Sequence, residues 1–226
     1  AQSGAQNPAL HKLFADEWER GLRESPESAT YNGDSRFNDR WSDFSLPAIA
    51  ARAAADRAAL EALHAIDRQT LSAADQLDYD TFEWTLQRSI ERQAFREYLQ
   101  PVSHQGGPQT FDGITEVLPF ATLKDYQDWL KRLQALPAAI GQSTVLMQEG
   151  VKAGNLPPRV LMERVPAQIA AQVVGDPTKS AFYKPFLKFP DSIAQADRDK
   201  LQAEAKRIVA ADVVPAYRSL QTYFNE

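Results

Sequence analysis

EGVKAGNLPPRVLMERVP, residues 149–166, is the part of the chain with the clearest signals for the end of one helix and the start of the next. It reads as the end of one helix, a turn at Gly154 and Asn155, and a new helix that starts at Pro157 and Pro158. Glycine and asparagine commonly follow the last residue of a helix, because they tolerate the left-handed backbone needed there. Proline is favoured in a first turn, where its missing N–H is not needed. The stretch therefore predicts two consecutive helices joined by a short turn.

Helix signals of the same kind occur along the rest of the chain. Asn7 and Pro8 form a cap and first-turn pair, and Pro47 fits the first turn of another helix. Residues 72–75 and 122–125 have the form of capping boxes. The period-2 alternation typical of strands is nearly absent. The sequence therefore predicts an all-α fold, an irregular array of about six to eight helices.

Several prolines and two irregular segments interrupt these helices. Pro137, Pro166 and Pro215 lie inside helical patterns and are expected to kink them, because proline lacks an N–H and clashes with the preceding turn. Residues 25–45 read as a loop region. Residues 101–119 are the least helical part, and a short helical turn or a strand pair could form within them. Long, kinked helices are the expected result.

The composition is that of a globular protein with one large helical domain over residues 1–226, of which residues 1–7 are expected to form a flexible tail. Of the 226 residues, 43% are hydrophobic, which is enough for a buried core. The net charge of −5 argues against a nucleic-acid partner. No apolar run approaches the roughly 20 residues needed to span a membrane. The chain has no cysteine, so disulfides and thiolate sites are excluded.

The two ends of the chain carry further hints. The start, AQSGAQNP, is small and polar, like the end left by removal of a signal peptide. The last helical pattern keeps Tyr217, Leu220, Tyr223 and Phe224 to its end. Each such side chain is worth roughly 1.5–3 kcal/mol when fully buried, so these residues need a partner surface. That surface is either the domain's own core or a further part of a larger protein.

No catalytic or metal-binding motif is present. His11, His64 and His104 are the only histidines, and none has a second histidine one helical turn away. Glu61 and His64 form a Glu-x-x-His unit, but a di-metal site needs a second copy, so a pair on a helix surface is the favoured interpretation. Nucleophile elbows and phosphate-binding loops are also missing. We therefore predict no catalytic residue, no metal ligand and no cofactor within this chain.

The best candidate for ligand contact is the run His104, Gln105, Gly106 and Gly107. Glycines let a backbone approach a bound chain closely, and glutamine offers both a donor and an acceptor. An extended peptide could pair with such a backbone. A plain structural loop is the competing interpretation. Arg159 is a candidate partner for a substrate carboxylate, although an ion pair with Glu163 on the same helix is the simpler expectation.

Six segments together carry a family resemblance: ATYNGDSRFNDRWSDFS, LHAIDRQTLSAADQLDYDTFEWTL, QGGPQTFDGITEVLPF, EGVKAGNLPPRVLMERV, FYKPFLKFPDSI and VVPAYRSLQTYF. Each is weak alone, but their order and spacing resemble domain-of-unknown-function family 885. Its members are bacterial, mostly exported proteins that look like zinc-dependent peptidases. The zinc-binding His-Glu-x-x-His signature of the family lies downstream, in a C-terminal half that this sequence does not include.

The resemblance implies that this chain is the N-terminal part of a larger two-part protein, exported to the periplasm. In similar helical metallopeptidases this half caps a deep cleft and restricts it to short peptides. Zinc and catalysis are then implied for the parent protein, and the missing catalytic half is the expected partner. Two alternatives stay open: a non-enzymatic binding or scaffolding module of the cell envelope, and a metal-binding bundle built on Glu61 and His64.

Overall fold

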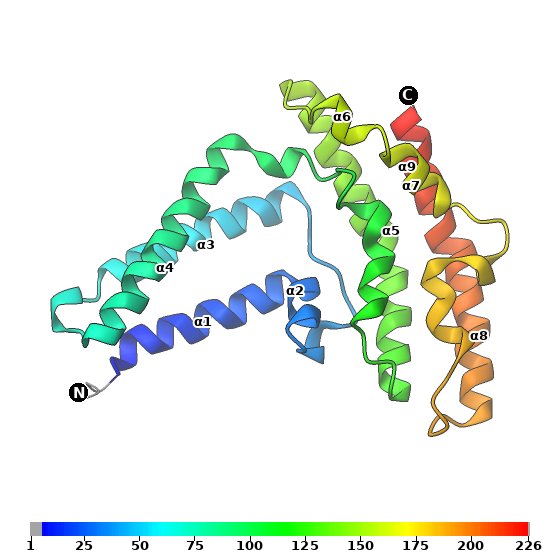
Figure 1. Ribbon diagram of the computed structural model, residues 1–226, viewed down its shortest axis with the longest axis horizontal. Coiled ribbons are helices and arrows are strands. Elements are labelled where there is room, and N and C mark those ends of the chain that lie inside the picture. The colour runs from blue at the N-terminus through cyan, green and yellow to red at the C-terminus, as the bar shows by residue number, and fades with distance from the viewer. Residues whose placement is uncertain (1–5, 226) are drawn as a thin grey trace. The chain divides into compact units, whose positions relative to one another are not determined.

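The computed structural model describes residues 6–225, so most of the tail predicted over residues 1–7 lies outside them. Within this range the chain forms nine α-helices and no strand, which confirms the all-α prediction (Figure 1). The chain divides into two compact units. One comprises the residues up to Glu24 together with Leu46–Glu97, and the other comprises Ser25–Ser45 and the residues from Tyr98 onward. The single domain predicted for residues 1–226 stays a prediction, because a compact unit is a domain only if it folds alone.

The first unit consists of three helices: α1 (Pro8–Glu24), α3 (Leu46–His64) and α4 (Ala73–Arg92). The predicted cap of α1 is present, since the Asn7 side-chain oxygen accepts from the N–H groups of Ala9 and Leu10 at 3.0 and 3.1 Å. A small apolar cluster buries Leu10, Leu63, Leu71 and Tyr79. Packing of one apolar face per helix thus produces this unit.

Only half of the capping box predicted for residues 72–75 forms. The Ser72 hydroxyl accepts from the Asp75 N–H at 3.1 Å. The Asp75 carboxylate does not return this bond but accepts from the Asn7 N–H and from His11 Nε2, each at 2.8 Å. Its side chain is only 3% exposed. Asp75 therefore joins the start of α4 to the start of α1.

The second unit is built around the long helix α5 (Leu123–Ala153). The capping box predicted at Thr122 and Asp125 is complete, and Gly154 ends the helix as expected. Other helices of this unit are α2 (Pro26–Tyr31), α6 (Arg159–Met162), α7 (Val165–Ala171), α8 (Gln195–Ile208) and α9 (Val214–Asn225). Helices α8 and α9 pack on α5 and share one large core with it. Among residues 6–225 no helix is both long and apolar enough to cross a bilayer.

The three internal prolines have different effects. Helix α5 continues through Pro137 without a break. Pro166 coincides with a break, because it lies in the first turn of α7 and separates that helix from α6. Before Pro215 the chain widens into a π-helical turn, Val209–Val213, between α8 and α9. A wider turn relieves the clash that proline makes with the preceding carbonyl. These two breaks, together with α2 in the segment predicted as a loop, give nine helices within residues 6–225 against the predicted six to eight.

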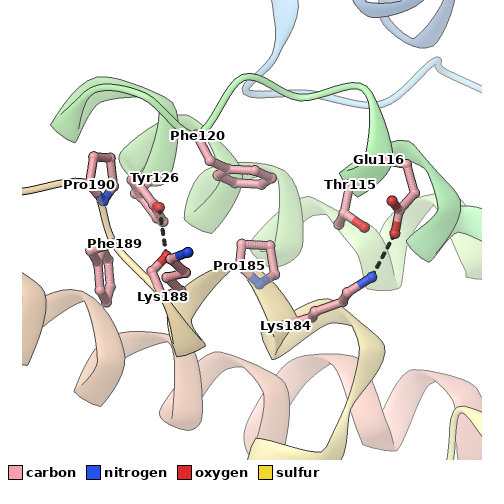
Figure 2. Close-up of a pocket in the computed structure, with 9 residues that line it drawn as sticks. All are labelled: Thr115, Glu116, Phe120, Tyr126, Lys184, Pro185, Lys188, Phe189 and Pro190. Carbon is pink, nitrogen blue, oxygen red and sulfur yellow. Dashed lines mark hydrogen bonds and ion pairs between the residues drawn. The ribbon is translucent and has the colours of Figure 1, made fainter.

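The connector from Asp176 to Pro190 is anchored on α5 by its aromatic residues and by two of its carbonyl groups. It forms two 3₁₀ segments, η6 (Pro177–Lys179) and η7 (Ala181–Leu187), with Phe182, Tyr183 and Phe186 buried. The Trp129 indole N–H donates to the Phe182 carbonyl at 3.1 Å. The Tyr126 hydroxyl donates to the Lys188 carbonyl at 3.3 Å (Figure 2). Side chains of α5 thus satisfy carbonyls that this irregular backbone leaves unpaired.

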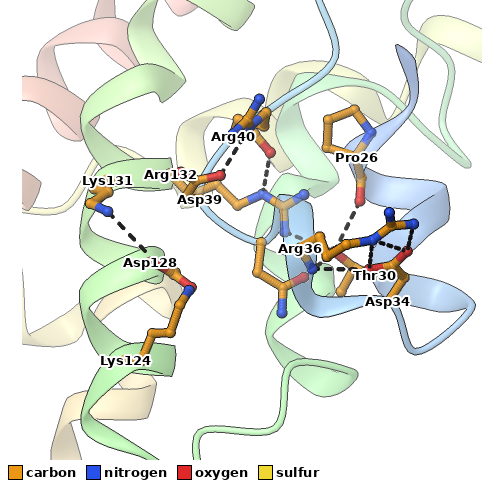
Figure 3. A network of polar contacts seen from close by, with 11 residues as sticks. Pro26, Thr30, Asp34, Arg36, Asp39, Arg40, Lys124, Asp128, Lys131 and Arg132 are labelled. Carbon is orange, nitrogen blue, oxygen red and sulfur yellow. Dashed lines mark hydrogen bonds and ion pairs between the residues drawn. The ribbon is translucent and has the colours of Figure 1, made fainter. Parts of the chain in front are cut away.

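A second anchor of the same kind holds residues 25–45, which were predicted as a loop and contain α2. Arg132 of α5 is fully buried; its Nε donates to the Arg40 carbonyl at 2.7 Å and its Nη1 donates to the Thr30 hydroxyl at 3.1 Å (Figure 3). That hydroxyl lies 2.7 Å from the Asn38 side-chain oxygen. Burial lowers the pKa of Arg132 to about 10, so the guanidinium remains charged at neutral pH. Within residues 6–225 the bonded partners of this buried cation are neutral oxygens, and they tie the segment to α5.

Candidate functional site

The predicted contact loop at His104–Gly107 is a tight turn whose backbone is bonded inside the protein. The Ser103 N–H donates to the Gly106 carbonyl at 2.8 Å, and the return bond is 3.3 Å. The His104 N–H donates to the Leu161 carbonyl at 3.1 Å, and the His104 carbonyl accepts from the Gln168 side chain at 3.0 Å. These groups are therefore already paired and are not free to extend a bound peptide as a strand.

Gly107 is required by the protein's own chain. Its φ is +134°, a backbone conformation that residues other than glycine rarely adopt. A Cβ there would lie 2.7 Å from Gln109 Oε1 and 2.9 Å from the Pro101 carbonyl oxygen. Gln109 is buried and its amide donates to the Ser103 carbonyl at 2.6 Å. The glycine thus makes room for Gln109, whereas its suggested approach to a ligand stays a prediction.

Two buried polar atoms beside this turn are left without a partner among the described residues. They are Nδ1 of His104 and Oε1 of Gln109. Buried polar atoms of this kind are commonly satisfied by ordered water. The turn is therefore a polar, well-bonded region with room for at most a few small polar contacts.

Arg159 lies near this turn in the fold. It opens α6, and two residues later the Leu161 carbonyl bonds to His104. Arg159 is exposed, and no ion pair joins it to Glu163 within residues 6–225. Gln105 is also exposed. The side chains of Gln105 and Arg159 are the members of the predicted set that face solvent.

An apolar groove of about 550 Å³ borders the same turn and was missed by the sequence reasoning. Residues 99–102, the end of α5, residues 155–157, Met162 and the last turn of α9 line it. Its walls include Val151 and Leu156, which are 59% and 58% exposed. Val160 and Leu161, which precede the groove residue Met162 in the chain, are exposed as well. Contiguous exposed apolar surface of this kind marks an interaction site.

Few polar groups interrupt the groove. The Gln100 amide donates to the Asn155 side-chain oxygen at 2.6 Å, and Lys152 pairs with Glu149 at 2.7 Å. The signal that could have found the groove was the apolar end of the last helix. Tyr217 and Leu220 dock on the core of the second unit, whereas Tyr223 and Phe224 are only half-buried and line the groove.

The Glu-x-x-His unit on α3 forms no metal site among residues 6–225. Glu61 and His64 are both exposed. His64 Nε2 lies 2.6 Å from the Glu83 carboxylate of α4, so the His64 side chain forms a hydrogen bond from α3 to α4. Groups of three or more side chains suited to hold a metal ion are not found in the described part of the chain.

Comparison with known proteins agrees with this architecture. A family model described as "Bacterial protein of unknown function (DUF885)" matches residues 26–226. No curated protein shows significant similarity to the chain. A crystal structure described as "the putative lipoprotein from Colwellia psychrerythraea" has a TM-score of 0.83, with 17% identity over 96% of this chain and 40% of that chain. The likeness establishes a shared fold, and this chain spans two fifths of that longer one.

Proposed function

Because this chain belongs to the DUF885 family of bacterial proteins, we propose that it is the helical, cleft-forming N-terminal region of an exported zinc-dependent peptidase. The peptidase activity comes from the resemblance described above. In this proposal the zinc ligands and the catalytic glutamate belong to a second half that carries His-Glu-x-x-His. The present chain shapes the cleft and supplies no catalytic residue.

The observation that carries the proposal is the exposed apolar groove beside the 103–107 turn. A contiguous apolar surface is costly in water, so a partner surface is expected to cover it. The same fold occurs as two fifths of a longer chain, which supports the remainder of a longer protein as that partner. We therefore place the second half against Leu156, Val151 and the end of α9.

The same proposal assigns the protein to the cell envelope, as an exported and periplasmic protein. The description of the Colwellia psychrerythraea protein as a lipoprotein is consistent with this location. Short peptides are the proposed substrates, and Gln105 and Arg159 are the exposed groups proposed to contact them.

The test compares this chain with a longer family protein that includes the His-Glu-x-x-His half. Zinc content is measured by elemental analysis, and hydrolysis is measured with a mixture of short fluorogenic peptides. The chain alone is expected to bind no stoichiometric zinc and to cleave nothing, whereas the longer protein should do both. Cleavage by the 226-residue chain alone, abolished by a chelator, would contradict the proposal.

The groove is tested in the longer protein with two matched substitutions. Leu156→Ser places a hydroxyl in the groove, and Leu187→Ser makes the same change at a residue that is 64% exposed and outside it. Leu156→Ser is expected to lower the melting temperature of the longer protein but not of this chain. Equal effects of the two substitutions would mean that the second half does not cover the groove.

A non-enzymatic binding or scaffolding module of the envelope is the second candidate. The size and apolar lining of the groove favour it, because pockets of this kind also hold ligands. It predicts that the longer protein fails to cleave peptides even when its zinc site is filled. The hydrolysis measurement described above therefore separates the two candidates.

A further inference from the structure

A second pocket, of about 360 Å³, lies beside η7 in the second unit. The end of the 3₁₀ segment η5 (Pro108–Glu116), the start of α5 and residues 184–190 line it (Figure 2). Its volume is near the lower end of the range for small-molecule sites, so a ligand of modest size would fill it. None of the proposed peptidase contacts lies here.

Three aromatic rings form one continuous wall of the pocket. The ring centres of Phe120 and Tyr126 are 5.2 Å apart, and those of Tyr126 and Phe189 are 4.7 Å apart. Pro185 and Pro190 add further apolar surface. Rings at such spacings present flat faces on which another ring or an aliphatic chain can pack.

Phe120 adopts an unusual backbone conformation at the edge of this wall. Its φ is +42°, and left-handed backbone is rare for a bulky residue and costs about 1–2 kcal/mol. The Phe120 ring packs edge-on against Trp129, with ring centres 6.2 Å apart, as well as against Tyr126. These contacts hold the strained residue in place, and strain of this kind tends to occur at ligand-contacting positions.

The charges around the pocket are unbalanced. Lys184 Nζ lies 2.7 Å from Glu116 Oε1, so these two lining charges neutralise each other. Lys188 also lines the pocket, beside Tyr126, and forms no ion pair within residues 6–225 (Figure 2). Among the residues that line the pocket one positive charge is therefore in excess, beside Tyr126, the central ring of the aromatic wall.

We propose that this pocket binds a small carboxylate with an apolar, preferably aromatic, body. The ring packs on Phe120, Tyr126 and Phe189, and the carboxylate pairs with Lys188. An ammonium and a carboxylate in contact form a charge-assisted hydrogen bond, which is stronger than one between neutral groups. The site is separate from the proposed peptide cleft and does not depend on zinc or on a second half.

The experiment titrates the 226-residue chain with 3-phenylpropionate and follows its amide signals by NMR. The uncharged 3-phenylpropionamide has the same shape and serves as the control ligand. A ligand of this size is expected to bind with a Kd in the roughly millimolar range. Shifts should be concentrated at residues 115–126 and 184–190, and the amide should bind more weakly. Equal binding of the two ligands, or no saturable shift in these residues, would overturn the proposal.

Two variants sharpen the measurement. Lys188→Gln is expected to raise the Kd for the carboxylate about threefold, as removal of a solvent-exposed partner charge does, and to leave binding of the amide unchanged. Lys179→Gln makes the same change at an exposed lysine of the same connector outside the pocket and should have no effect. If both substitutions raised the Kd for the carboxylate equally, the attraction would come from the overall charge of the protein, and the assigned site would be refuted.

Discussion

Trp41 and Arg132 contact each other in two ways. The Trp41 indole N–H donates to the Arg132 carbonyl at 2.8 Å, and the Arg132 guanidinium lies 4.8 Å from the centre of the Trp41 ring. The ring also stacks on Phe111 at 4.6 Å. Because the two residues are 91 positions apart, this double contact joins residues 25–45 to α5 within one compact unit.

Arg132→Ala is expected to destabilise the protein by about 2–4 kcal/mol, because it opens a cavity and leaves the Arg40 carbonyl without its donor. Arg132→Met should cost less, since methionine fills the space and removes a buried charge whose hydrogen-bond partners within residues 6–225 are neutral oxygens. The free energy of unfolding from urea denaturation checks both values. The control is Arg40→Ala, which keeps the carbonyl that Arg132 uses and should change stability by no more than about 0.5 kcal/mol. A large loss in Arg40→Ala would show that the side chain of Arg40, rather than its carbonyl, holds the segment.

Two glycines of α5 are expected to respond to alanine with opposite signs. At Gly150 a Cβ would lie 2.7 Å from the Leu99 carbonyl oxygen and 3.1 Å from that of Asn155. These are backbone atoms that cannot move away cheaply, so Gly150→Ala should cost about 1–3 kcal/mol despite the better helix propensity of alanine. At Gly141 no atom lies within 4 Å, so Gly141→Ala should stabilise by about 0.5–1 kcal/mol. Thermal unfolding of the two variants gives the comparison, and stabilisation by both would show that the contact at Leu99 is looser than described.

The adjacent glycines of the candidate loop form a second pair. Gly107→Ala should cost at least about 2 kcal/mol, because it combines a positive φ with a clash at Gln109 and Pro101. Gly106→Ala meets nothing within 4 Å and should be tolerated within about 0.5 kcal/mol. Urea denaturation measures both. If Gly106→Ala leaves stability unchanged but impairs peptide cleavage by the longer protein, the ligand role predicted for this loop gains support.

Stability below neutral pH should depend on Asp75. The hydrogen bond from His11, followed by that from the Asn7 N–H, lowers the pKa of this carboxylate below its usual value near 4. A carboxyl group whose pKa is lower in the folded state stabilises the protein above the unfolded value of about 3.9, and this contribution is lost as the pH falls through the folded value. Asp75→Asn should therefore melt at a lower temperature than the parent at pH 7, and the difference should shrink below about pH 4. A difference that is constant with pH would exclude ionisation of Asp75 as its source.

Much of the fold was predictable from local signals. The caps at Asn7 and Thr122 and the stop at Gly154 appear where the sequence places them, because each depends on hydrogen bonds or backbone angles within one turn. Less local features were predicted poorly. The Asp75 carboxylate accepts a hydrogen bond from the start of α1 instead of completing its own capping box. Residues 25–45 contain a helix that their loop-like composition did not indicate. Both outcomes depend on partners far away in the sequence.

The candidate site shows the same limit. The sequence pointed to His104–Gly107 and Arg159, and the structure brings the turn and the start of α6 together. The structure also shows that Gly107 leaves room for the side chain of Gln109 and that an apolar groove borders the turn. The apolar end of the last helix was the one local signal for that groove, and it did not locate it, because the walls come from five separate segments of the second unit.

By itself the sequence determined the helical class, the helix ends at Asn7, Thr122 and Gly154, and the absence of cysteine, since these follow from residue type and spacing over a few positions. Only the tertiary structure decided that residues 25–45 join the second unit, that Arg132 is buried and bonded to Arg40 and Thr30, and where the two pockets lie. The physical reason is that burial and hydrogen-bond partners are set by contacts between distant segments. Those contacts exist only once α5 and its neighbours have packed.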